Sequence, residues 1–188
     1  MSDNRFVELM QPNLIRFASD LKAVLRVVED PEVDDETRIE TAGALIHVIS
    51  SGAAIPGVRG VLRRLSDVLV IRLVLDRGRE RSPEAFEQHQ ADSPELLEPL
   101  GDELEAMNEY LGDRVKVLRK AVEKFSKANH QGHSAESCVR DTDSSNWLYD
   151  AVNEKLIEVD LDEQEIAREL KRVDQILAPL DAKLRAAG

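Results

Sequence analysis

The sequence is poor in the residues that build sheets, turns and disulfides. Aromatic residues make up 4% of its 188 positions, and there are only 9 glycines and 7 prolines. Strands favour aromatic and β-branched residues, and multi-stranded folds need frequent turns, so this composition argues against an all-β fold. The single cysteine, Cys138, cannot form a disulfide within the chain, which fits a reducing compartment. We therefore expect a cytoplasmic protein.

Positive charge is also scarce. The chain has 25 Lys and Arg against 37 Asp and Glu, which gives a formal net charge of -12. Nucleic-acid phosphates repel such a chain, so general binding to DNA or RNA is not expected. The most hydrophobic segment, residues 42–75, is interrupted by charged side chains and has no apolar run of the roughly 20 residues that span a bilayer. We expect this segment to be buried core.

Apolar residues recur in steps of three and four along most of the chain, the spacing of one helix face. Pro12 should kink or split the first helix near Gln11. Residues 129–145 are polar and are expected to form a loop. Helices are expected over residues 5–29, 35–50, 58–79, 83–90, 94–129, 145–158 and from about 162 through 184.

A polar stretch from Arg79 to Pro94 is the candidate boundary within the chain. It divides an N-terminal helical region, residues 1–82, from a C-terminal helical region, residues 83–188. Long apolar faces on both sides favour packing of the second region on the first. The sequence therefore predicts one all-α bundle of about five to seven helices.

Residues 49–71 read ISSGAAIPGVRGVLRRLSDVLVI. This stretch resembles the YkvA-like family, a bacterial domain family of unknown function. In that family a helix ends in a pattern close to S-P-x-D-x-I-P-D, followed by a turn, L-D-D and an apolar helix. The resemblance covers about residues 33–81, and the matching positions are Ser50, Ile55, Pro56, Leu65 and Asp67.

The acidic positions of the family pattern are mostly absent. They are Ala53, Gly57 and Ser66 here, and only Asp67 keeps its carboxylate. If the acidic cluster of the family binds a metal or orders a turn, this chain has mostly lost that capacity. The resemblance implies a helical hairpin with a proline-containing elbow at Ile55 and Pro56, and it implies no reaction.

A charged residue, Arg72, lies within the apolar run from Val68 to Leu75. Burying an unpaired guanidinium is costly, so Arg72 should be paired or should reach the surface. Asp76 lies four residues later on the same helix face, whereas Asp67, five residues earlier, is less well placed. We expect an internal Arg72–Asp76 ion pair within the hairpin, in preference to a site for a ligand anion.

Histidines and the cysteine supply the candidate chemistry. His130, His133 and Cys138 could hold zinc, but their spacing is not that of a standard zinc module, so a solvated loop is favoured. His47 lies in an apolar run and is interpreted as a core residue in preference to a catalytic base. Neither a metal nor any other cofactor is expected.

A small basic patch, Arg59, Arg63 and Arg64, occurs at the elbow. It could contact anionic lipid or an acidic partner. Three arginines are few, and a solvated helix face is the favoured interpretation.

The last apolar seam contains Ile166, Leu170, Val173 and Leu177 at heptad-like spacing. It could pack on residues 94–129 of the same chain or pair with a second copy as a homodimer.

No catalytic motif is recognisable, so we expect no enzymatic activity and no small-molecule substrate. The predicted function is that of a non-catalytic cytoplasmic helical interaction or scaffold protein, with a protein partner or a second copy. Two alternatives remain open. One is a peripheral membrane protein that uses the 42–75 hairpin and the elbow arginines, and the other is a metal-binding sensor or enzyme.

Overall fold

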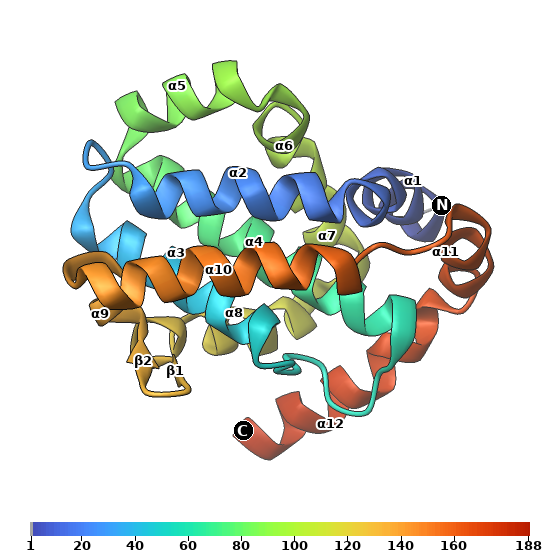
Figure 1. The fold of residues 1–188 in the computed structure, drawn as a ribbon. Coiled ribbons are helices and arrows are strands. Elements are labelled where there is room, and N and C mark those ends of the chain that lie inside the picture. The colour runs from blue at the N-terminus through green and yellow to red at the C-terminus, as the bar shows by residue number, and fades with distance from the viewer. Residues whose placement is uncertain (1) are drawn as a thin grey trace.

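Helix α4 (Gly60–Arg81) runs through the centre of the molecule (Figure 1). The computed structural model describes residues 2–188 and is all-α, as the sequence predicts. Every residue of α4 from Leu65 to Leu75 is buried. A helix that is apolar on all sides is stable only when other helices surround it, and this explains its central position.

The other elements enclose α4. The α-helices are α1 (Ser2–Ile15), α2 (Phe17–Glu29), α3 (Asp35–Ile49), α5 (Pro83–Asp92), α6 (Pro94–Leu97), α7 (Leu100–Leu111), α8 (Val115–Val122), α9 (Ala135–Arg140), α10 (Thr142–Glu158), α11 (Glu163–Leu170) and α12 (Leu177–Ala187). Short 3-10 turns are η1 (Gly112–Arg114), η2 (Phe125–Lys127) and η3 (Val173–Ile176), and β1 (Asn129–His130) pairs with β2 (His133–Ser134) in an antiparallel hairpin.

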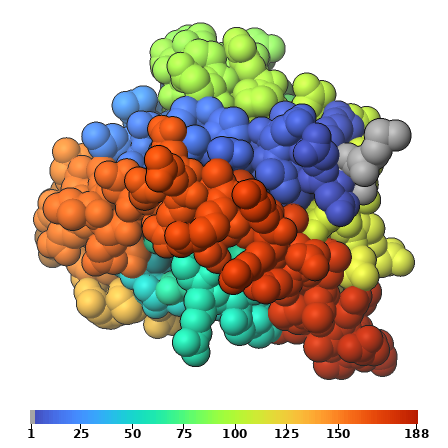
Figure 2. All heavy atoms as spheres, turned by 90° about the vertical axis from the view of Figure 1, so that its right-hand side faces the viewer, coloured from blue at the N-terminus to red at the C-terminus, as the bar shows by residue number. Residues whose placement is uncertain are grey.

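The two halves of the chain share one core. Helix α1 contacts α7 and α11, helices α2 and α3 contact α10, and α4 contacts α8. Figure 2 shows the C-terminal segments, orange to red, lying directly against the blue N-terminal ones. The buried apolar side chains of both halves, from Phe6 to Leu180, form a single cluster.

The first helical segment divides later than predicted. Pro12 lies inside α1, and the break is at Arg16, where the backbone leaves helical geometry with ψ 9°. The amide of Arg16 still donates to the carbonyl of Pro12 at 3.0 Å. The prediction of a split near Gln11 is therefore wrong, because the helix tolerates the missing amide of Pro12 and turns one helical turn after it.

The predicted helix over residues 94–129 is also wrong as a single element. It consists of α6, α7, η1, α8 and η2. Gly112 ends α7 with a positive φ of 56°, a conformation that glycine adopts without steric cost. The turn at Gly112 separates α7 from η1 and α8.

The predicted loop over residues 129–145 contains regular structure. Gln131 and Gly132 turn the β1–β2 hairpin with positive φ values of 52° and 83°. Ser134 then caps α9 through a reciprocal capping box with Ser137. Asp141 accepts from the amide of Ser144 and caps the start of α10, the helix that contains Trp147.

Arg72 is the largest fully buried side chain, and its partners come from two other helices. Its Nη2 donates to Oδ2 of Asp20 in α2 at 3.0 Å, and its Nε donates to Oε2 of Glu103 in α7 at 2.9 Å. Both carboxylates are themselves buried. Arg72, Asp20 and Glu103 therefore form a buried ion triad that joins three helices.

The prediction of an Arg72–Asp76 ion pair is wrong. Asp76 accepts instead from Arg79 at 2.8 Å, near the partly exposed end of α4. Side chains in a helix lean toward its N-terminus, which directs Arg72 away from the following turn and into the core. Two carboxylates on other helices are within its reach there.

Two further polar residues, Asn13 and Arg16, extend the triad into a larger network. Asn13 in α1 donates from Nδ2 to Oε1 of Glu103 at 2.7 Å. Arg16 donates to Oδ1 of Asn13 at 2.9 Å, and its Nε lies 4.0 Å from Asp20. Burial raises the pKa of Asp20, and the Arg72 guanidinium opposes that shift. The network extends the triad to α1 through Asn13, so it connects four helices.

The C-terminal seam packs within the chain. Ile166, Leu170 and Val173 are buried, and α11 contacts α1 and α4. Leu177 begins α12, which contacts α8 and η1 within the predicted 94–129 partner region. The homodimer stays a prediction.

A close approach between α3 and η2 generates the first testable prediction. A Cβ at Gly43 would collide with the backbone of Phe125, whereas a Cβ at Gly101 in α7 would meet nothing within 4 Å. Gly43→Ala should lower the free energy of unfolding by about 1–3 kcal/mol because backbone must move. The matched control Gly101→Ala should be neutral or raise it by up to about 1 kcal/mol. Urea unfolding measures both, and equal effects would contradict the packing of η2 on α3.

Candidate functional site

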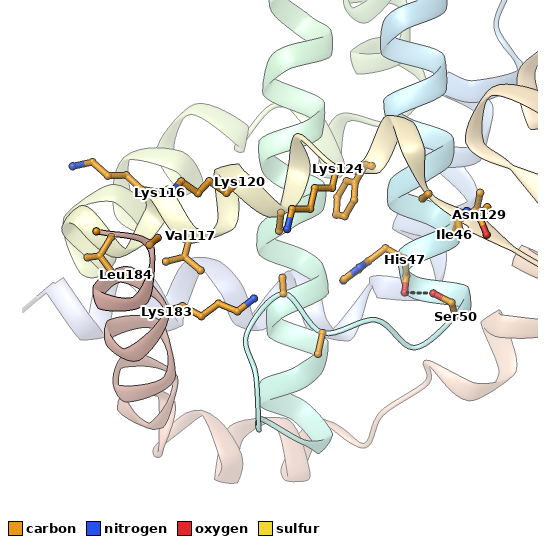
Figure 3. Close-up of a pocket in the computed structure, with 17 residues that line it drawn as sticks. Ile46, His47, Ser50, Lys116, Val117, Lys120, Lys124, Asn129, Lys183 and Leu184 are labelled. Atoms are coloured by element: carbon orange, nitrogen blue, oxygen red, sulfur yellow. Dashed lines mark hydrogen bonds between the residues drawn. The ribbon is translucent and has the colours of Figure 1, made fainter.

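A cavity of about 640 Å³ lies between the C-terminal end of α3, the following loop, α8, η2 and α12 (Figure 3). The α3–α4 loop contributes Ser50, Ala53 and Ala54 to its wall. Helix α12 closes another side, and a two-pronged ion pair from Arg114 to Asp181, at 2.7 and 3.0 Å, holds it against η1. The volume is in the range of about 300–1,000 Å³ that small-molecule sites occupy.

The wall of the cavity is mainly apolar. Aliphatic side chains and one aromatic ring form most of it, and they include Ile46, Ala54, Val117, Ala121, Phe125 and Leu184. The neutral polar residues are Ser50 and Asn129. A ligand in this cavity would therefore lie against hydrocarbon over most of its surface.

Four lysines line the same cavity. Lys116, Lys120 and Lys124 recur at steps of four on and just after α8, and Lys183 comes from α12. Lys116 pairs with Asp113 at 2.7 Å. In Figure 3 the side chains of Lys124 and Lys183 extend toward the space in front of His47 from opposite walls, whereas Lys116 points outward.

The lining contains no acidic side chain among residues 2–188. Within this described part of the chain, Lys120, Lys124 and Lys183 make no ion pair or hydrogen bond through their amines. The cavity is consequently a concentrated positive site on an otherwise acidic protein.

His47 forms part of the inner wall, on α3. Its ring packs against Phe125 with centroids 5.1 Å apart, and Nε2 lies 3.7 Å from Oδ1 of Asp67, beyond hydrogen-bond distance. Burial, with a smaller contribution from the charge of Arg63, lowers the pKa of His47 to about 4. The imidazole is therefore neutral near pH 7, and the positive charge of the site comes from the lysines.

Asp67 lies behind His47, on α4, and does not line the cavity. Its Oδ2 accepts from Nη1 of Arg64 at 2.9 Å. Burial raises the pKa of Asp67 to about 6, and this effect outweighs the opposing charge of Arg64. Arg64 also lies over the ring of Phe17 at 4.9 Å. Arg64 thus joins the start of α4 to α2, and Asp67 holds Arg64 while facing His47 on α3.

The predicted elbow lies between α3 and α4. Ile55 is fully buried, Pro56 is exposed, and Gly57 has a positive φ of 79°. The elbow arginines do not act together, because Arg64 is directed inward to Asp67 while Arg59 is exposed. The elbow is a structural turn beside the cavity.

The histidine and cysteine candidates are not brought together as metal ligands. Cys138 is buried, and burial with the charge of Asp141 raises its pKa to about 11. His133 contacts Ser144 at 2.9 Å and stacks on Trp147 with centroids 4.4 Å apart, and His130 is at the hairpin. Residues 2–188 contain no group of three or more side chains placed to hold a metal ion.

Sequence reasoning missed the cavity lysines, although a signal existed. The chain contains eight lysines, and three of them follow each other at steps of four from Lys116 to Lys124. That spacing is also typical of any solvated helix face. Only the fold reveals that Lys183, far along the chain, lies across the cavity from them.

Comparison with known proteins does not add a relative. No family model, no curated protein and no solved structure matches the chain. The resemblance to the YkvA-like family stays a prediction. Across residues 2–188, no helix combines the length and hydrophobicity needed to cross a membrane.

His47 in the cavity wall and Asp67 behind it predict a pH effect on stability. An unfolded chain protonates His47 below about pH 6.5, whereas the folded chain does so only below about 4, so His47 costs stability as the pH falls through this interval. His47→Gln should remove that loss. Relative to wild type, it should gain up to about 3 kcal/mol in unfolding free energy between pH 6.5 and 4.

Asp67 acts in the opposite sense, because its raised pKa makes the folded state bind a proton more readily between about pH 6 and 3.8. The contributions of His47 and Asp67 to wild-type stability therefore oppose each other over this range, and His47→Gln removes only the contribution of His47. Urea unfolding at several pH values measures it. His130→Gln, at the β1–β2 hairpin, is the control, and an equal pH dependence in the two variants would contradict the burial of His47.

Proposed function

We propose that the protein is a non-catalytic binding protein and that its functional site is the lysine-lined cavity. The observation that carries the proposal is the combination of a cavity of about 640 Å³, a largely apolar wall and three lysine amines, those of Lys120, Lys124 and Lys183, that have no acidic partner among the described residues. Ligand sites are typically concave and apolar, with a few polar groups that fix orientation. This cavity has that composition.

The side chains around the cavity favour holding a ligand over converting it. Nucleophilic catalysis needs a hydroxyl or thiol within hydrogen-bond reach of a base. Ser50 Oγ instead donates to the backbone carbonyl of His47 at 3.3 Å. His47 Nε2 faces Asp67, and Cys138 is not among the lining residues. The cavity therefore supplies no nucleophile–base pair.

The same structure weakens the membrane alternative in the form that the sequence suggests. Val68, Ile71 and Leu75, the apolar part of the 42–75 hairpin, are no more than 1% exposed. They pack in the core and are not exposed for contact with a bilayer. The predicted protein partner or second copy is compatible with a small-molecule site. Such a partner could bind an outer face while the cavity holds its ligand.

A neutral fluorescent probe tests the proposed function. N-phenyl-1-naphthylamine should bind with increased emission, because the apolar wall removes it from water. Ala121→Trp places a large ring on the cavity wall and should abolish most of the binding. The control Ala182→Trp adds the same ring at an exposed position of α12 outside the cavity and should bind like wild type.

Circular dichroism checks that each variant is folded, and Ala53→Trp, in the exposed loop at the cavity, replaces Ala121→Trp if that variant is unfolded. Absence of probe binding to folded wild type would contradict the proposed function. So would equal binding to the cavity variant and the control.

A further inference from the structure

We propose that the cavity binds a single-chain amphiphile with an anionic head group, a carboxylate or a phosphate ester. The head group lies between Lys124 and Lys183, and the hydrocarbon chain lies along the apolar wall. This inference rests on the proposed function and specifies its ligand class.

The charge distribution points to an anion. The chain as a whole has a net charge of -12, yet four of its eight lysines line one cavity. Lys116 is paired with Asp113, but the amines of Lys120, Lys124 and Lys183 repel one another, and within residues 2–188 no acidic side chain of the lining compensates them. An anionic head group would remove that repulsion and accept charge-assisted hydrogen bonds from the amines.

The choice of cation supports a ligand role for these lysines. Arginine makes the internal ion pairs of the fold, as Arg72, Arg64 and Arg114 do. Lys120, Lys124 and Lys183 form no such pair in the described chain. Lysine binds an anion as a mobile point charge, which suits a head group that the fold does not supply.

The apolar wall requires more than an anion. Ile46, Val117, Ala121, Phe125 and Leu184 would stay in contact with water around an inorganic ion. A hydrocarbon chain would cover them and gain about 25 cal/mol for each Å² removed from water. A neutral lipid would cover the wall but leave the lysines uncompensated, so only an anionic amphiphile satisfies both parts of the cavity.

Four ligands with the same chain test the proposal: dodecanoate, dodecyl phosphate, dodecanol and dodecylammonium. Each competes with N-phenyl-1-naphthylamine at concentrations at which it is monomeric. Both anions should bind about tenfold more tightly than dodecanol, and added salt should shrink the difference. Dodecylammonium should bind more weakly than dodecanol. The ratio of the two anions shows which head group is preferred.

A double substitution assigns the head-group position. Lys124→Gln with Lys183→Gln should reduce anion affinity about tenfold and leave dodecanol affinity unchanged. Lys22→Gln with Lys171→Gln makes the same change in net charge away from the cavity and should leave all four affinities unchanged.

The outcomes separate the two proposals. If the neutral probe binds and dodecanoate and dodecyl phosphate bind no better than dodecanol, the ligand class is wrong while the proposed function stands. Equal losses of anion affinity in the two double variants would also overturn it. If neither the probe nor any of the four ligands binds, both proposals fail.

Discussion

The fold depends on the buried ion triad of Arg72, Asp20 and Glu103. Arg72 lies at the centre of α4, and its two carboxylate partners lie on α2 and α7. Asn13 extends the contact to α1. Transferring a charged side chain from water to the protein interior costs several kcal/mol per ion. The triad is therefore stable only when each charge keeps its partner. The triad therefore restricts how these four helices can pack.

The position of α4 in turn determines the cavity. Helix α4 packs against α3 and α8, which provide two of the cavity walls. Its first turns place Asp67 behind His47, so the inner wall and the core are in direct contact. Gly43 on α3 admits the backbone of Phe125, which completes the wall at η2. The lysines then sit on elements whose positions the apolar core determines.

The helical class and the core faces could be predicted because they depend on local spacing, which three- and four-residue periodicity reports directly. The partners of Arg72 could not, since they lie 31 and 52 residues away and the apparent local partner, Asp76, is on the wrong side of it. The helix break at Gly112 could not be predicted either, because glycine can continue a helix or end it with a positive φ, as it does here. The cavity could not be predicted because Lys183 and Lys124, far apart in the sequence, line it from opposite walls, which no single segment of sequence encodes.

The unfolding free energy of Arg72→Met tests the central claim most directly. Methionine preserves most of the apolar stem but leaves Asp20 and Glu103 buried without a cation, so we predict a loss of about 3–5 kcal/mol. Adding Asp20→Asn and Glu103→Gln removes the unpaired charges and should recover part of that loss. An unfolding free energy of Arg72→Met within about 1 kcal/mol of the wild-type value would contradict this account. A loss that small is typical of an exposed ion pair, and it would mean that the triad does not hold the helices together.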